Sequence, residues 1–184
     1  MKVLIIIGTA RKGRKSVYAA EKALKAFKSR SHDAEIFDIK EEEFPRYLGN
    51  RTYVNDEEPV PDGAKKLSDR VEASDLIVLA TPEYNHSFPG ALKTAMDHLY
   101  PEYDDKVFGF ITVSAGGFGG VRCLGHLHDY VNALGGFAGP ELTVSDIGSK
   151  FNEEGELIDE SENERFYRFV EDCEKFREKM REGL

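Results

Sequence analysis

Residues 2–8 read KVLIIIG, and residues 9–16, which follow directly, read TARKGRKS. The first stretch is almost continuously apolar and β-branched, which is typical of a strand buried on both faces of a parallel sheet. The second stretch is polar and predicts a loop. From about Ser16, apolar residues recur at helical spacing, so a helix with one apolar face is expected. These apolar positions are Val17, Ala20, Leu24 and Phe27.

Strands and helices are predicted to alternate along the rest of the chain. Pro140 lies inside the last predicted strand, which indicates a position near a sheet edge. Alternating strands and helices predict right-handed crossovers and a parallel sheet with helices on both faces. The further strands are expected at Glu35–Ile39, Asp75–Ala80, Val107–Val113 and Phe137–Val144. The further helices are expected from Asp62 as a cap, from Pro89 in a first turn, over Val121–Leu134, and from the capping-box pattern Ser161-x-x-Glu164.

The composition bounds the class of protein. A length of 184 residues fits one domain over residues 1–184. A net charge of −9 argues against nucleic acid or an anionic membrane surface as the main partner. No apolar run approaches the ~20 residues that a membrane helix needs. Cys123 and Cys173 are far apart and form no CxxC pair, so we expect free thiols and a reducing, cytoplasmic compartment.

The loop before the first helix combines backbone amides with positive charge. Residues 1–20 hold five Lys and Arg residues and no Asp or Glu. A helix N-terminus favours an anion, Arg11 can hold a phosphate through two donors, and the hydroxyls of Thr9 and Ser16 can add neutral ones. The loop matches neither GxxxxGK[ST] nor GxGxxG, so it suits a phosphomonoester better than a dinucleotide pyrophosphate. The alternative is an ordinary loop in which Ser16 caps the helix.

Two more loops should lie at the same edge of the sheet, where open α/β sheets bind ligands. After the fourth strand, residues 114–120 read SAGGFGG. Its four glycines would let the backbone approach a flat ligand, although a flexible turn has the same composition. After the third strand, residues 81–99 read TPEYNHSFPGALKTAMDHL, with special backbone residues packed between a strand and a helix.

Two other features allow more than one interpretation. His126 and His128 form a His-x-His pair, but no third ligand stands at a suitable spacing, so no metal site is expected. Cys123 follows the glycine-rich loop and is either a reactive thiol or, more simply, a small packed residue.

The stretch Thr81–Asp97 resembles the PEYNxSxPGxLKNAxD signature of the NADPH-dependent FMN reductase family. The resemblance extends over roughly residues 2–144. The loop at residues 8–16 is similar to the GSxRxxS theme of that family, with two departures. Thr9 stands in place of the usual serine, and the gap from Arg11 to Ser16 is longer than usual.

The resemblance implies a flavodoxin-like three-layer sandwich with a five-stranded parallel sheet in the order 2-1-3-4-5. It also implies bound FMN that takes hydride from NADPH or NADH and passes electrons to a flavin, a quinone or a similar small acceptor, with no catalytic side chain. Tyr84 would flank the flavin, and backbone groups of residues 83–85 would face the ring edge. The implied cofactor-binding residues are Thr9, Arg11, Ser16, Val17, Pro82, Glu83, Tyr84, Asn85, Ser114, Ala115, Gly116 and Gly117.

Family members pair through one side of the molecule, so the resemblance also implies a homodimer or homotetramer. The aromatic-bearing segment Lys40–Pro61 and the helix from Pro89 are the expected contributors. Two rival interpretations stay open. One is a flavodoxin-like electron carrier, although the loop at residues 8–16 lacks the Thr-Gly-Thr sequence of flavodoxins. The other is an FMN-binding partner protein without enzymatic activity.

Overall fold

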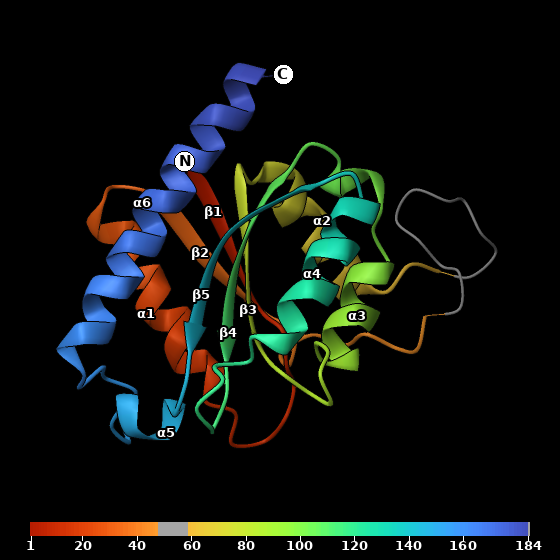
Figure 1. Cartoon of the computed structure of the whole chain (residues 1–184). Coiled ribbons are helices and arrows are strands. Elements are labelled where there is room, and N and C mark those ends of the chain that lie inside the picture. The colour runs from red at the N-terminus through yellow and green to blue at the C-terminus, as the bar shows by residue number, and fades with distance from the viewer. Residues whose placement is uncertain (48–58, 184) are drawn as a thin grey trace.

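Five parallel strands form one sheet in the order β2-β1-β3-β4-β5 in this computed structural model, which describes residues 1–47 and 59–183 (Figure 1). The order and the pairing confirm the expected fold. The last two strands have the predicted bounds, whereas the second begins two residues earlier and the third continues to Pro82. The strands are β1 (Lys2–Ile7), β2 (Asp33–Asp38), β3 (Leu76–Pro82), β4 (Val107–Val113) and β5 (Phe137–Val144).

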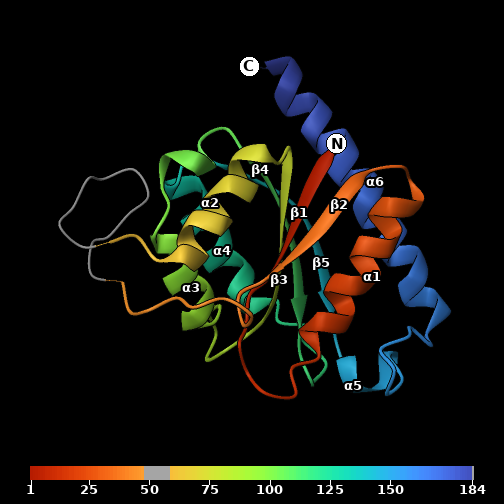
Figure 2. The ribbon, with the colours of Figure 1, turned by 180° about the vertical axis from the view of Figure 1, so that it is seen from behind.

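Helices cover both faces of this sheet (Figures 1 and 2). The two views place α1 and α6 on one face and α2, α3 and α4 on the other. The helical segments are α1 (Ser16–Ser29), α2 (Asp62–Ala73), α3 (Gly90–Asp97), η1 (Pro101–Tyr103), α4 (Arg122–Ala133), α5 (Ile147–Lys150) and α6 (Glu160–Gly183).

The side chains of β1 alternate between two hydrophobic cores. Ile5 and Ile7 belong to the core beneath α1 and α6, whereas Leu4 and Ile6 belong to the core beneath α2, α3 and α4. Successive side chains of a strand point to opposite faces, so a strand covered on both faces needs an unbroken apolar sequence. This packing explains the KVLIIIG stretch and fixes β1 in the middle of the sheet.

The edge strand β5 contains the predicted irregularity. Its pairing with β4 shifts between Phe108 and Phe110, so Gly139 and Pro140 form a bulge. A proline cannot donate to a ladder, and an edge strand with a bulge tolerates it. The prediction of an edge position from Pro140 is therefore confirmed.

Several helix starts differ from the sequence prediction. The last helix begins at Glu160, and Asp159 accepts a hydrogen bond from the amide of Ser161 at 3.0 Å, so Asp159 rather than Ser161 caps it. Asp62 is the first residue of α2 and makes no cap, and Pro89 precedes α3 instead of lying in its first turn. The short helices α5 and η1 were not predicted. Capping depends on side-chain rotamers that a sequence pattern does not specify.

Part of the expected pairing segment lies outside the described residues. Within its described part, Phe44 packs edge-on against Phe37 with ring centroids 6.3 Å apart. Residues 48–58, which include Tyr53, fall outside it. Among the helices that the structure describes, none combines the length and the apolar character needed to cross a membrane.

Candidate functional site

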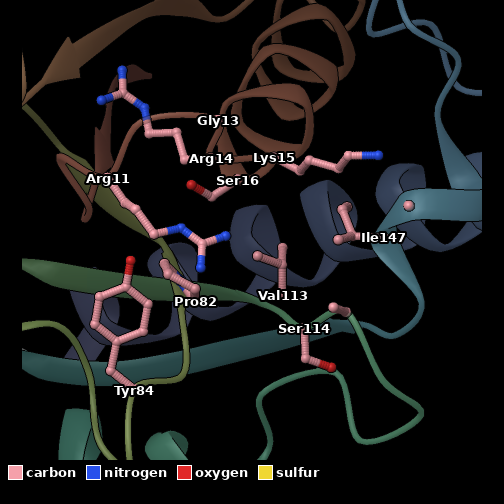
Figure 3. A pocket seen from close by; sticks show the side chains of 12 residues that line it. Arg11, Gly13, Arg14, Lys15, Ser16, Pro82, Tyr84, Val113, Ser114 and Ile147 are labelled. Carbon is pink, nitrogen blue, oxygen red and sulfur yellow. The ribbon is translucent and has the colours of Figure 1, made fainter.

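A cavity of about 290 Å³ opens at the carboxyl ends of the strands, among the loops that follow β1, β3, β4 and β5 (Figure 3). This is the edge where the strand order reverses between β1 and β3, and small-molecule sites there span ~300–1,000 Å³. Half of the predicted site residues line it. The lining residues are Arg11, Gly13, Arg14, Lys15, Ser16, Pro82, Tyr84, Val113, Ser114, Ala115, Ile147 and Gly148.

One end of the cavity, which we call the cationic end, is formed by the loop that leads into α1. Ser16 is the first residue of this helix, and its hydroxyl is buried without a hydrogen-bond partner in the described part of the chain. Figure 3 shows the guanidinium of Arg11 extending across the cavity toward Val113, with Ser16 at the start of α1 beside it. A helix N-terminus, a cation and an unpaired hydroxyl together favour an anion. The alternative that Ser16 merely caps α1 is wrong, because Lys15 holds the cap position.

The neighbouring cations have different roles. Arg14 pairs with Asp38 at the end of β2 and donates to the carbonyl of Thr9 at 3.1 Å, so this arginine braces the loop. In Figure 3 its guanidinium points away from the cavity. Lys15 extends along the side formed by α5, where its Nζ lies near Gly148. The charged side chains of Arg11 and Lys15 thus lie along the cavity.

The opposite end, which we call the turn end, begins with a tight turn after β3. The amide of Tyr84 donates to the carbonyl of Ser87 at 2.7 Å, and the amide of Ser87 donates back at 3.0 Å. Asn85 and His86 between them have φ values of 50° and 66°, as a two-residue hairpin turn requires. The Tyr84 amide is therefore already paired within the turn, and Asn85 is exposed at its tip.

The ring of Tyr84 is held from the other side of the cavity. Its hydroxyl lies 3.0 Å from the Oγ1 of Thr9, which is itself buried. Thr9 therefore stands behind the cavity wall and orients Tyr84. Val17, another predicted site residue, does not line the cavity but packs partly buried against the hydrophobic core. The hydrogen bond joins the loops after β1 and β3 and fixes the width of the cavity between them.

The glycine-rich loop after β4 completes the turn end. The Oγ of Ser114 donates to the carbonyl of Gly116 at 2.6 Å, and Gly116 and Gly117 lie exposed beyond the cavity lining. In the described part of the chain, no backbone hydrogen bond uses the amides of Ala115, Gly116 or Gly117 as donors. The loop therefore keeps amides available to an incoming ligand, as its composition predicts.

Glu83 serves the neighbouring helix. Its Oε2 accepts a hydrogen bond from the amide of Arg122, the first residue of α4, at 3.2 Å. The guanidinium of Arg122 lies 4.2 Å from the ring centroid of Phe118, which is 65% exposed. Glu83 therefore caps α4 and links the loops after β3 and β4.

A family model described as NADPH-dependent FMN reductase matches residues 1–150. The chain belongs to this family. Its members are oxidoreductases, and the family resemblance seen in the Thr81–Asp97 stretch is confirmed.

Curated relatives and solved structures agree with this assignment. An NADPH azoreductase of Bacillus sp. (strain OY1-2) is 34% identical over 148 residues, covering 79% of this chain and 77% of the relative. An FMN-dependent NADPH-azoreductase of Staphylococcus aureus is 34% identical over 157 residues, covering 84% of this chain and 82% of the relative. The structure of FerB, a flavoenzyme NAD(P)H:(acceptor) oxidoreductase from Paracoccus denitrificans, superimposes with a TM-score of 0.80 at 23% identity, covering 97% and 98% of the two chains.

The residues of this reductase fit FMN. The buried, unpaired hydroxyl of Ser16 lacks an acceptor or donor partner that a phosphate oxygen would supply. Arg11 adds the charge that a phosphate needs, and the turn end offers the ring of Tyr84 beside Pro82. The lining therefore offers a hydroxyl and a cation that suit the phosphate of FMN, and an aromatic ring and a proline that suit its flavin.

Sequence reasoning missed half of the lining. Arg14 and Lys15 were seen as part of a charged loop, but which cation pairs with Asp38 depends on a strand 24 residues away. Ile147 and Gly148 carry no motif. The signal that could have found them is topological, because the carboxyl end of β5 meets the same edge of the sheet as those of β1, β3 and β4.

The role of Cys123 is resolved by its surroundings. The Sγ of Cys123 is buried and donates to the carbonyl of Gly120 at 3.1 Å, and burial raises the pKa of this thiol to about 12. Cys123 is therefore a packed residue. The Nε2 of His128 lies 2.6 Å from Glu141, and the described residues hold no group of three potential ligands for a metal ion.

Proposed function

We propose that this chain binds one FMN in the cavity and carries electrons from NADPH or NADH to an azo compound, a quinone or a free flavin. The relatives named as azoreductases support the first acceptor class. When bound, FMN supplies the hydride chemistry, since its ring accepts hydride from a nicotinamide and releases the electrons to the acceptor. The protein then has to bind FMN, orient its ring and leave the ring accessible to the nicotinamide and the acceptor.

The observation that carries this proposal is the Ser16 hydroxyl, buried at a helix N-terminus near Arg11, whose guanidinium makes no ion pair within residues 1–47 and 59–183. A buried hydroxyl without a partner costs ~1–3 kcal/mol, so a site that keeps one is built to receive a ligand there. In our proposal Arg11 binds the phosphate through its guanidinium, and Ser16 and the first amides of α1 donate to its remaining oxygens. A neutral ligand would leave the charge of Arg11 without a partner.

The turn end holds the flavin ring in our proposal. Tyr84, oriented by Thr9, and Pro82 stand on one side, and the amides of the loop at residues 115–117 face the ring edge. Amides directed at the ring stabilise negative charge that develops there on reduction. The chain contains no tryptophan that could cover the outer face of the ring, so a nicotinamide and an acceptor can stack on it in turn.

We further propose a homodimer or homotetramer located in the cytoplasm, with residues 1–184 as a single FMN-binding domain. Phe118 and Val121 are 65% and 45% exposed beside the turn end, which supports a second copy covering this side. The free, buried thiols of Cys123 and Cys173 suit a reducing compartment. Light scattering at micromolar concentration checks the assembly, and a mass near the 20.7 kDa of one chain would contradict it.

The function is tested by turnover of the FMN-loaded chain with NADPH in the absence of oxygen, followed separately with methyl red, benzoquinone and riboflavin. We expect catalytic loss of NADPH with at least one of the three and at most stoichiometric loss without an acceptor. An electron carrier or a non-enzymatic FMN-binding protein would show no catalytic turnover with any acceptor.

A further inference from the structure

One wall of the cavity comes from a part of the chain that the sequence motifs do not mark. Ile147 and Gly148 of α5 line the cavity opposite the loop that leads into α1. A Cβ added at Gly148 would lie 3.5 Å from the Nζ of Lys15. The position of α5 therefore sets the width of the cavity beside the cationic end.

The start of α5 is tied to the glycine-rich loop by backbone hydrogen bonds. The amide of Asp146 donates to the carbonyl of Gly116 at 3.1 Å, and the amide of Ile147 donates to the carbonyl of Ser114 at 3.0 Å. Asp146 has a φ of 48°, a conformation that non-glycine residues adopt with strain. Such a turn persists when its surroundings hold it, so the other end of α5 needs an anchor.

That anchor is an ionic cluster at the start of α6, composed of Lys150, Asp159, Glu162 and Arg165. Lys150 pairs with Asp159, and its Nζ lies 3.4 Å from Oε1 of Glu162. The Glu162 side chain is 5% exposed and accepts two hydrogen bonds from Arg165 at 2.8 Å. Arg165 in turn donates to the carbonyl of Thr143 in β5 at 2.7 Å. The cluster therefore joins the strand before α5, the end of α5 and the helix that follows.

A small hairpin between Lys150 and α6 makes this connection short. The amide of Ile158 donates to the carbonyl of Lys150 at 2.9 Å, and Phe151 pairs with Leu157 as an antiparallel bridge. The ring of Phe151 is buried against the core beneath α1 and α6. The end of α5 thus has both a hydrophobic and an ionic attachment, and the ionic one holds a buried carboxylate.

We propose that the cluster of Lys150, Asp159, Glu162 and Arg165 positions the α5 wall and thereby sets how tightly this chain retains FMN. Most of this cluster lies beyond residue 150, where the match to the family model ends. Lys150 and Glu162 are positioning residues here, since they act on the cofactor through α5. The proposal rests on the proposed function for its ligand, whereas the placement of α5 can be measured without any ligand.

The Glu162 carboxylate is the buried charge of the cluster, whereas the side chains of Lys150 and Arg165 that pair with it are 20% and 42% exposed. Loss of the charge of Lys150 or of Glu162 breaks the ionic attachment between the end of α5 and α6, and a buried carboxylate that loses a partner rearranges toward water. A wall that is in place only about a tenth of the time raises the apparent dissociation constant about ten-fold. We therefore expect about ten-fold weaker FMN binding when either Lys150 or Glu162 loses its charge.

The test measures FMN affinity of Lys150→Met and Glu162→Gln by quenching of flavin fluorescence on titration into the apoprotein. A long-range charge effect on the phosphate would weaken binding in the lysine variant and tighten it in the glutamate variant. Positioning by the cluster weakens binding in both. Lys150→Arg keeps the ion pairs and should restore most of the affinity.

Arg30→Met is the matched control. Arg30 pairs with Glu171 and Glu174 of α6, the helix that also carries Glu162. These pairs attach α6 to the end of α1, away from the cavity. The control variant should lose stability in urea without a change in FMN affinity. Equal weakening in Arg30→Met and Lys150→Met would overturn the proposal, because general loosening of α6 would then explain both.

Amide hydrogen exchange of the apoproteins measures the placement of α5 without any ligand. We expect faster exchange at residues 145–150 in Lys150→Met than in Arg30→Met. Unchanged exchange there, or unchanged FMN affinity in a wild-type chain that binds FMN, would overturn the positioning role. A wild-type chain that takes up no FMN would instead contradict the proposed function, while the exchange result would still decide whether the cluster holds the wall.

Discussion

The two ends of the cavity satisfy their polar groups in opposite ways. At the turn end, the amide and carbonyl of Tyr84 pair with Ser87, the Tyr84 hydroxyl meets Thr9, and Ser114 bonds within its own loop. At the cationic end, the Ser16 hydroxyl is buried and unpaired, and Arg11 makes no ion pair in the described part of the chain. Apart from the amides of residues 115–117, the turn end pairs the polar groups named here before any ligand arrives, whereas the cationic end holds a buried hydroxyl that has no partner in the described part of the chain.

This difference indicates that one end of the cavity supplies a preformed shape and the other supplies most of the binding free energy. A self-satisfied loop costs little to keep in its binding geometry, so the turn end supplies a preformed shape. An unpaired hydroxyl and a free guanidinium gain most from a charged ligand, so the cationic end supplies binding free energy. Substitutions at the turn end should therefore change folding stability or access, and those at the cationic end should change affinity for the phosphate.

The largest effect is expected at Gly119, which holds the glycine-rich loop in shape. Its φ is +61°, and an added Cβ would lie 2.9 Å from the Cβ of Thr143. Gly119→Val should lower the free energy of unfolding by roughly 2–6 kcal/mol, since backbone strain and overpacking add. Urea unfolding of the apoprotein measures this loss.

Gly117→Val is the matched control in the same loop. A Cβ there meets nothing within 4 Å, so stability should stay within ~0.5 kcal/mol of the wild type. FMN binding should nevertheless weaken, because the added bulk stands where the ring edge approaches. Equal instability of the two variants would show that the loop is not shaped as described.

Arg11→Ala tests the cationic end. A charge-assisted hydrogen bond contributes ~1.5–3 kcal/mol, so FMN affinity should fall roughly ten- to a hundred-fold. Riboflavin, which lacks the phosphate, should bind both proteins alike. Titration of both flavins measures the difference, with Lys12→Ala as the control that leaves FMN affinity nearly unchanged. Equal losses of affinity for FMN and for riboflavin would contradict the distinction between the cationic end and the turn end.

Tyr84→Phe tests whether the turn end is held by its own hydrogen bonds. Loss of the bond to Thr9 should lower the free energy of unfolding by ~0.5–1.5 kcal/mol. Tyr18→Phe provides the comparison, since its hydroxyl makes a longer, exposed bond of 3.3 Å to Glu153 and should matter less. Larger destabilisation by Tyr18→Phe in urea would argue against a preformed turn end.

The smallest expected change is at Cys123, behind the glycine-rich loop. With its pKa raised to about 12 by burial, roughly one thiol in ten thousand is ionised at pH 8. Native protein should therefore react negligibly with a disulfide reagent at that pH, while both cysteines react after unfolding. Fast reaction of one thiol in the native protein would show that the turn end opens readily.

The sequence was sufficient for the sheet and for the central site loops. Unbroken apolar stretches such as KVLIIIG are explained by burial on two faces, and the three loops at the carboxyl edge carry strong local signals. The roles of Thr9, Glu83 and Arg14 could not be predicted from the sequence, because each depends on one partner distant in the chain. The α5 wall was missed because Ile147 and Gly148 carry no motif and reach the cavity only through the position of the carboxyl end of β5.

The central claim is that FMN held in this cavity receives hydride directly from a nicotinamide. The most direct test loads the chain with FMN, removes oxygen, mixes it with one equivalent of NADPH or NADH and follows the flavin absorbance. We predict that the yellow absorbance is lost within seconds with at least one nicotinamide. Absorbance that stays unchanged with both nicotinamides, while dithionite bleaches the same sample, would contradict the account.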